Sequence, residues 1–151
     1  MVFAVAATAP LLSLAFADRE RVRAGEQFAT QPAVSYARLE RAAALNPFSS
    51  QPATLEGSIA VRRGDLPRAD AAFGRALERV PDDQYAVLER GAIASARGDR
   101  PRASRLLARA AALAPRDALT RQALDVVRSG ATIDLVELNR RILRSATQLI
   151  G

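Results

Sequence analysis

The stretch GDLPRADAAFGRALERVPDD, residues 64–83, is followed 34 residues later by GDRPRASRLLARAAALAPRD, residues 98–117. The two segments align without a gap, and the residues that coincide either shape a backbone turn or allow close packing. They are paired as Gly64 with Gly98, Pro67 with Pro101, Ala69 with Ala103, Phe73 with Leu107, Ala76 with Ala110, and Pro81 with Pro115. The same offset upstream aligns Leu39, Ala42 and Pro47 with Phe73, Ala76 and Pro81. An internal repeat of this length is typical of solenoid proteins.

Each copy of the repeat carries the signals of two helices joined by a turn. Gly64 and Gly98 suit the left-handed position that ends a helix, and Pro67 and Pro101 suit the first turn of the next helix. Aromatic residues make up only 5% of the chain, so the interior is built largely from small side chains that let helices approach closely. We therefore predict an all-α fold of antiparallel helical hairpins.

This pattern resembles the tetratricopeptide repeat (TPR), in which small residues, one large apolar residue and a proline recur at set positions. The matching residues are Gly57, Ala69, Phe73, Ala76 and Pro81 in one copy, and Gly91, Ala103, Leu107, Ala110 and Pro115 in the next. The resemblance implies an α-solenoid over residues 31–117, with a half repeat at 31–49 and full repeats at 50–83 and 84–117. First helices depart from the family pattern, most clearly where the charged Glu56 and Arg90 replace apolar residues.

The last part of the chain, residues 118–151, is expected to cap the solenoid, because a hairpin buries its apolar face only against a neighbour. Residues 118–129 are expected to supply another first helix, which Ser129 and Gly130 end. The run that follows Thr132 places an apolar stripe on one helical face, made by Leu135, Leu138, Ile142 and Leu149. We interpret it as a closing helix, and the alternative is an amphipathic helix that binds a partner.

The first segment of the chain, MVFAVAATAPLLSLAFA at residues 1–17, carries no charge. Its length lies near the lower limit for a helix that spans a membrane, and Pro10 would kink such a helix. Three interpretations remain open: a membrane anchor, whole or the end of a longer span; a secretory signal cleaved after Ala17; and a buried helix.

Charged residues follow this segment directly, and residues 18–30 are expected to form a helical connector. Arg19, Arg21 and Arg23 lie after the apolar run, and no cation precedes it. This distribution favours an anchor in the cell membrane with the repeats on the cytoplasmic side.

Composition argues against an enzyme. The chain has no cysteine and no histidine, which removes thiol nucleophiles and the commonest metal ligand and general base. The closest pairs of acids suit structural roles: Asp82 and Asp83 fit a turn and a helix N-cap, and Glu56 and Glu89 fit solvated positions. We expect no catalytic residues, no metal and no cofactor.

In proteins of the TPR family the first helices line a concave groove that holds a protein or peptide partner, and the resemblance implies such a groove here. Its candidate residues are Thr54, Leu55, Ser58, Arg62, Tyr85, Leu88 and Glu89. Tyr85 is the expected anchor, since aromatic residues dominate such contacts. The basic and Asn residues by which some TPR proteins hold a terminal carboxylate are missing from these positions, so a chaperone adaptor is not supported.

All 22 basic side chains are Arg, and the formal net charge is +6. Arg102, Arg105 and Arg109 form a basic stripe on one helix. Nucleic acid is a poor partner for it, because no aromatic residues are interleaved and acids are spread through the same helices. Anionic lipid is a better candidate ligand, and a solvated outer face is the alternative.

The order of segments has a second, weaker resemblance, carried by the stretch ALNPFSSQP at residues 44–52 and by the layout as a whole. It is similar to the C-terminal repeat tails of bacterial membrane proteins of the O-antigen ligase and polymerase type. Two functions therefore remain open. The first is a membrane-tethered scaffold for protein–protein interaction, and the second is an accessory domain of an enzyme that assembles envelope glycans, with its catalytic part elsewhere.

Overall fold

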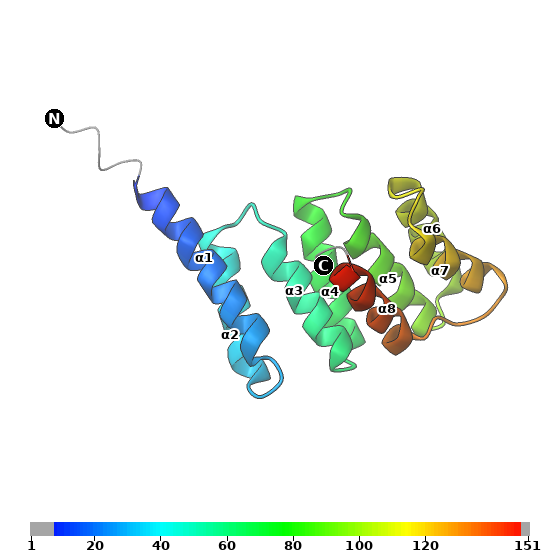
Figure 1. The fold of residues 1–151 in the computed structure, drawn as a ribbon, viewed down its shortest axis with the longest axis horizontal. Helices are drawn as coiled ribbons and strands as arrows, with labels where there is room; N and C mark the ends of the chain where they lie inside the picture. The colour runs from blue at the N-terminus through cyan, green and yellow to red at the C-terminus, as the bar shows by residue number, and fades with distance from the viewer. Residues whose placement is uncertain (1–7, 149–151) are drawn as a thin grey trace.

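The computed structural model describes residues 8–148, and within them it has eight helices and no strand (Figure 1). The helices are α1 (Thr8–Gln27), α2 (Pro32–Leu45), α3 (Gln51–Arg62), α4 (Leu66–Arg79), α5 (Gln84–Ala96), α6 (Arg100–Leu113), α7 (Ala118–Arg128) and α8 (Leu135–Gln148). The predicted all-α fold is confirmed.

The helices pack in consecutive pairs, α1 with α2, α3 with α4 and α5 with α6, and α7 packs on α6. The hairpins lie side by side in a row, which is the arrangement of an α-solenoid (Figure 1). The half repeat expected at residues 31–49 corresponds to α2. It has a first helix too, because α1 packs along it.

Local signals place the helix ends where the repeat predicts them. The side chains of Asp65, Asp83, Asp99 and Asp117 each accept a hydrogen bond from a backbone N–H in the first turn of the helix that follows. These bonds satisfy donors that have no partner inside the helix. Before two of these caps, Gly64 and Gly98 adopt φ angles of 76° and 80°, which favour glycine.

Glycine also sets the distance between the two helices of a hairpin. A Cβ atom added to Gly57 would lie 2.8 Å from the ring of Phe73, and one added to Gly91 would lie 2.8 Å from Leu107. Phe73 and Leu107 are fully buried. The small residue and the large apolar residue of each repeat are thus the two sides of one contact.

Arginine side chains connect successive hairpins on the outer surface. Arg79 donates to the carbonyl oxygen of Pro47 at 2.8 Å, and Arg109 donates to the carbonyl oxygen of Pro81 at 2.6 Å. Pro47 and Pro81 occupy the same place in the repeat. The same turn is therefore held twice, in each case by an arginine on the second helix of the next hairpin, although from different positions of that helix.

Helix α1 runs without interruption across the boundary between Ala17 and Asp18, where the apolar run ends. Pro10 lies in its first turn, where proline is tolerated. Ala17 and Ala24 are buried on the side that faces the solenoid. Within residues 8–148, no helix is both long enough and apolar enough to cross a membrane. Residues 1–7 of the predicted anchor lie outside the described residues.

Helix α8 does not extend the row of hairpins. It turns back after residues 129–134 and lies in front of α5 in Figure 1, in contact with α5 and beside the C-terminal end of α3. Its apolar residues Leu135, Leu138 and Ile142 pack on the cores of the two full repeats, whereas Leu149 of the predicted stripe lies outside the described residues.

Candidate functional site

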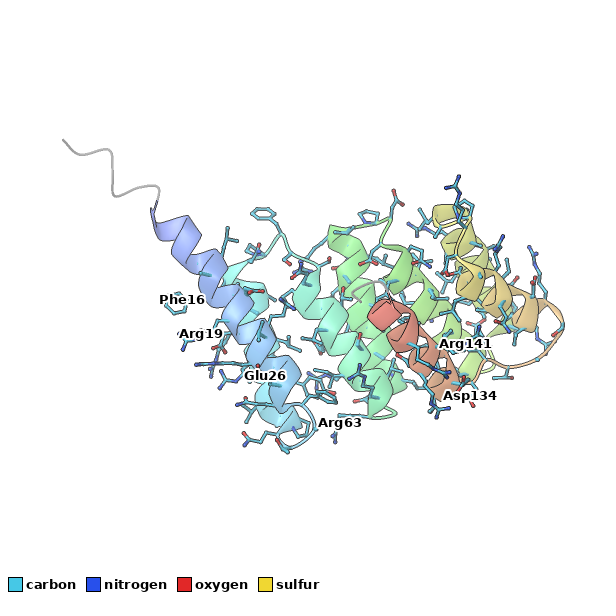
Figure 2. The ribbon with its side chains drawn as sticks, viewed as in Figure 1. Phe16, Arg19, Glu26, Arg63, Asp134 and Arg141 are labelled. Carbon is cyan, nitrogen blue, oxygen red and sulfur yellow. The ribbon has the colours of Figure 1, made fainter. Side chains whose placement is uncertain are left out.

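The first helices α3, α5 and α7 share the face of the solenoid on which α8 packs. The structure brings most of the predicted groove residues together on this face, from α3 and α5. We call this face, with α8 upon it, the groove. Figure 2 marks the course of α8 by Asp134, which precedes its first turn, and by Arg141.

Tyr85, the expected anchor for a partner, is part of the groove wall. Its ring meets that of Phe73 edge to face, with centroids 5.8 Å apart, and its hydroxyl forms a 3.0 Å hydrogen bond with Ser58. Burial raises the pKa of this hydroxyl above its usual value. The side chain therefore joins α3, α4 and α5 and is held in one place.

Two of the other predicted residues make contacts within the solenoid. The Thr54 hydroxyl donates to the carbonyl oxygen of Ser50 in its own helix. Leu55 packs on the cluster that joins α1 and α2 to α3, which includes Leu39 and Ile59. Both residues lie in the first two turns of α3.

Leu88 and Glu89 lie beneath α8 and are almost fully buried, at 2% and 0% exposure. The expectation of a solvated position for Glu89 is therefore wrong, and α8 is the reason. Neither carboxylate oxygen accepts a well-formed hydrogen bond from any residue that the structure describes. Burial raises the pKa of Glu89 to about 7, although the neighbouring Tyr85 and Asn139 act in the opposite direction.

Arg62 is the groove residue that remains exposed. Its guanidinium carbon lies 5.3 Å from the ring centre of Phe28, at the end of the first hairpin. It also lines a hollow of about 380 Å³ together with Val61 and residues of α8. A second hollow of about 180 Å³ lies between α7 and α8. Helix α8 thus occupies the groove without filling it.

Glu56 is the residue whose role sequence reasoning missed most clearly. It is 7% exposed, which corrects the expected solvated position. Its two oxygens accept from Arg68 at 2.8 Å and from Arg75 at 2.7 Å, both on α4. The sequence did contain a sign of this role. Glu56 stands where the family pattern has an apolar residue, and a charge at such a position needs a partner.

Arg90, the corresponding departure in the next repeat, lies 2.8 Å from Asp70. Arg102 of the basic stripe contacts the same carboxylate at 2.8 Å. Burial would raise the pKa of Asp70, but the hydrogen bonds from these two arginines lower it below its usual value. Asp70 therefore holds the two full repeats together.

The basic stripe is divided by these contacts. Arg102 pairs with Asp70, and Arg109 donates to Pro81 and approaches Asp82 at 3.5 Å. Arg105 is exposed on the same helix. Two of the three cations therefore serve to join hairpins. In the part of the chain that the structure describes, no group of three or more acids could hold a metal ion.

No protein-family model and no curated protein matches this sequence. Solved structures do match it. The TPR domain of OM64 from Arabidopsis superposes with a TM-score of 0.70 at 13% identity, over 78% of this chain and 98% of that one.

The second TPR domain of human RPAP3, solved in complex with the HSP70 peptide SGPTIEEVD, superposes with a TM-score of 0.68. The identity is again 13%, over 79% of this chain and 98% of the other. The fold of this chain is that of a tetratricopeptide repeat domain.

Proposed function

We propose that this chain is a non-catalytic scaffold that binds a protein partner in the groove of its TPR solenoid. The observation that carries the proposal is α8, because the groove already accommodates a helix. It does so through buried apolar contacts with Leu135 and Leu138, a recurring way in which grooves recognise peptides.

The charge of the groove indicates what kind of segment it takes. The peptide bound to the RPAP3 domain contains three acidic residues. In this chain the floor of the groove carries the carboxylate of Glu89, and the clamp for a terminal carboxylate is missing from the sequence. We infer that the partner is not an acidic tail of that type.

Site-specific photo-crosslinking in the cells that make the protein tests this function. A photoreactive amino acid at Arg62, beside the larger hollow, is expected to give a discrete adduct with one partner. The same group at Ala108, exposed on α6, serves as the control. Equal adducts from both positions, or none from position 62, would contradict binding in the groove.

We further propose that the N-terminal segment tethers the scaffold to the cell membrane, with the repeats on the cytoplasmic side. Leu14 and Phe16 support this, because they remain 46% and 54% exposed on α1. Figure 2 shows Phe16 and Arg19 directed away from the rest of the solenoid. Exposed apolar residues beside charged ones are typical of a surface that meets lipid.

Fractionation of cells that express the chain with a C-terminal tag tests the tether. The intact chain is expected in the membrane, protected from protease added to spheroplasts. The double substitution of Leu14 and Phe16 by Glu should release it, whereas Val22→Glu, on the same helix beyond the apolar run, should not. A soluble exported product that lacks residues 1–17 would contradict the tether.

The same exposed apolar residues favour the alternative, an accessory domain of an O-antigen ligase-like enzyme, in which α1 would continue from a membrane-embedded part. The gene region upstream of Met1 decides between the two. An in-frame extension that encodes apolar segments of about 20 residues supports the alternative.

A further inference from the structure

The groove is occupied in this structure by a segment of the same chain, and its contacts indicate what could replace it. Helix α8 presents Leu135, Leu138 and Ile142 to the solenoid, at spacings of three and four residues. Val136 packs on neither core cluster and is 69% exposed, at the edge of the hollow that Arg62 lines. The groove therefore recognises the apolar stripe of an amphipathic helix.

One polar group beneath α8 lacks a good hydrogen-bond partner. The carboxylate of Glu89 is fully buried beneath α8 and accepts no well-formed hydrogen bond within the described part of the chain. Asn139 is its neighbour on α8, but the Asn139 amide donates at 3.0 Å to the carbonyl oxygen of Leu135 in its own helix. A buried acid without a firm partner opposes the docking of α8.

A cation at the place of Asn139 would remove this defect. A guanidinium or ammonium group makes a charge-assisted hydrogen bond with a carboxylate, which is stronger than a neutral one. There is space for a longer side chain, because the hollow of about 380 Å³ is lined by Asn139 itself. Arg62 and Arg140 also line it, but both are exposed, so that solvent screens their repulsion.

The connection to α8 would allow the helix to leave while the solenoid stays intact. Residues 129–134 are fixed to α5 and α6, since Ile133 N–H donates to Ser95 at 3.0 Å and Arg100 donates to the carbonyl oxygen of Gly130. The ion pairs of Glu137 with Arg140 and Arg144 lie within α8 and would persist after release.

We propose that α8 is a replaceable occupant of the groove, and that the partner is an amphipathic helix with an arginine or lysine where α8 has Asn139. This inference rests on the scaffold function proposed above and specifies its ligand. Helix α8 then acts as a competitor, and a partner must bind more tightly than α8 does in order to displace it.

The test uses the full-length chain and a fluorescent peptide that copies residues 132–148, followed by anisotropy. Leu138→Asp should release α8 and allow the peptide to bind. The matched variant Val136→Asp, at a 69% exposed position outside both core clusters, should bind it as weakly as the unchanged chain. Circular dichroism of both variants confirms that the solenoid remains helical. Equal peptide binding by the two variants would overturn the inference.

The charge requirement is tested with a second peptide in which Asn139 is replaced by Arg. On the Leu138→Asp chain it should bind about tenfold more tightly than the first peptide, the gain of one charge-assisted hydrogen bond. Adding Glu89→Gln should abolish this gain and leave the first peptide bound. A gain that survives Glu89→Gln, or no gain at all, would overturn the assignment of a basic helix.

A dimer formed by exchange of α8, detected by light scattering of the unchanged chain, would also overturn the assignment and identify a second copy as the occupant. The failure of this inference differs from failure of the scaffold function. If the peptides fail while crosslinking from position 62 yields a discrete partner, the scaffold stands and only the identity of its ligand is wrong.

Discussion

Gly57 and Gly91 determine how closely the two helices of each full repeat approach, because the space for a Cβ atom is taken by Phe73 and Leu107. Gly74 provides a contrast. A Cβ atom there would lie 3.8 Å from the end of the Arg90 side chain, an ordinary contact. Only the first two positions require glycine for packing.

Substitution of Gly91 by Ala should therefore lower the free energy of unfolding by about 1–3 kcal/mol, as overpacking of a well-filled core does. Gly74→Ala should raise it by up to about 1 kcal/mol, since Ala favours the helix more than Gly. Urea denaturation of both variants measures the difference. Equal effects at the two positions would show that close helix packing is not what Gly91 provides.

Glu89 links stability to pH. Burial raises its pKa from 4.5 to about 7, so the native state binds the proton more tightly than the unfolded chain. Its protonated form contributes stability that is fully present below about pH 4.5 and is lost as the pH rises through about 7. The groups that face it are Tyr85 on its own helix and Asn139 on α8.

The free energy of unfolding should thus fall between pH 5 and pH 8 by up to about 3 kcal/mol, at about 1.4 kcal/mol for each pKa unit. Glu89→Gln should remove most of this fall and stabilise the chain at pH 8, because it mimics the neutral acid. Urea denaturation at the two pH values measures it, with Glu78→Gln at an exposed position as the control. If the free energy of unfolding fell equally between pH 5 and pH 8 in the Glu89→Gln variant, the role of this carboxylate would be contradicted.

At the scale of helices, the aspartate caps differ in what they hold. Asp65 accepts only the N–H of Arg68 at 3.1 Å in the contacts described. Asp117 accepts the backbone N–H groups of Leu119 and Thr120, and also the Gln84 side chain at 3.2 Å. Asp117 thereby connects α7 to α5 as well as starting α7.

Asp65→Ala should cost about 1 kcal/mol, the usual loss of a helix cap. Asp117→Ala should cost about twice as much, because the buried Thr120 hydroxyl and the half-buried Gln84 amide also lose Asp117 as an acceptor. Thermal unfolding followed by circular dichroism compares the two variants. If Asp65→Ala were as costly as Asp117→Ala, the link between α5 and α7 would contribute nothing.

Most helices were predictable because their signals are local. The 34-residue period, Gly64, Gly98 and the prolines define α3 to α6 from neighbouring residues alone. The place of α8 was not predictable in this way. An amphipathic stripe shows that one face of a helix is covered, but not which surface covers it. The burial of Glu89 depends on the position of α8, so it was not predictable either.

The first hairpin illustrates the same limit. The sequence has a break in composition at Asp18, yet α1 continues through it. Side chains on both sides of the break bond to α2, since the Ser13 hydroxyl donates to the carbonyl oxygen of Leu45 and Glu20 accepts from Arg38. The pattern of charges indicates whether a segment faces water or an apolar surface. The length of a helix such as α1 depends in addition on its packing against a neighbouring helix. The basic stripe was likewise visible in the sequence, but its use of Arg102 in pairing with Asp70 depends on the preceding repeat.

At the scale of the whole molecule, each hairpin contacts only its neighbours, so stability is expected to vary along the row. The first hairpin has a neighbour on one side, α3. Helices α5 and α6 lie between α4 and α7, and α8 contacts α5 in addition. Loss of a core side chain should therefore destabilise fewer helices in the first hairpin than in the central hairpin of α5 and α6.

Leu39 and Leu107 allow a matched test, because both are almost fully buried second-helix residues in equivalent positions. Leu39→Ala should speed amide hydrogen exchange in α1 and α2 and leave α5 and α6 protected. Leu107→Ala should speed exchange in α5, α6 and α7 together, since its cluster includes Val87 and Val127 from the flanking helices. Exchange by mass spectrometry resolves the helices separately. Uniform loss of protection in both variants would mean that the solenoid unfolds as one cooperative unit and that its ends are as stable as its centre.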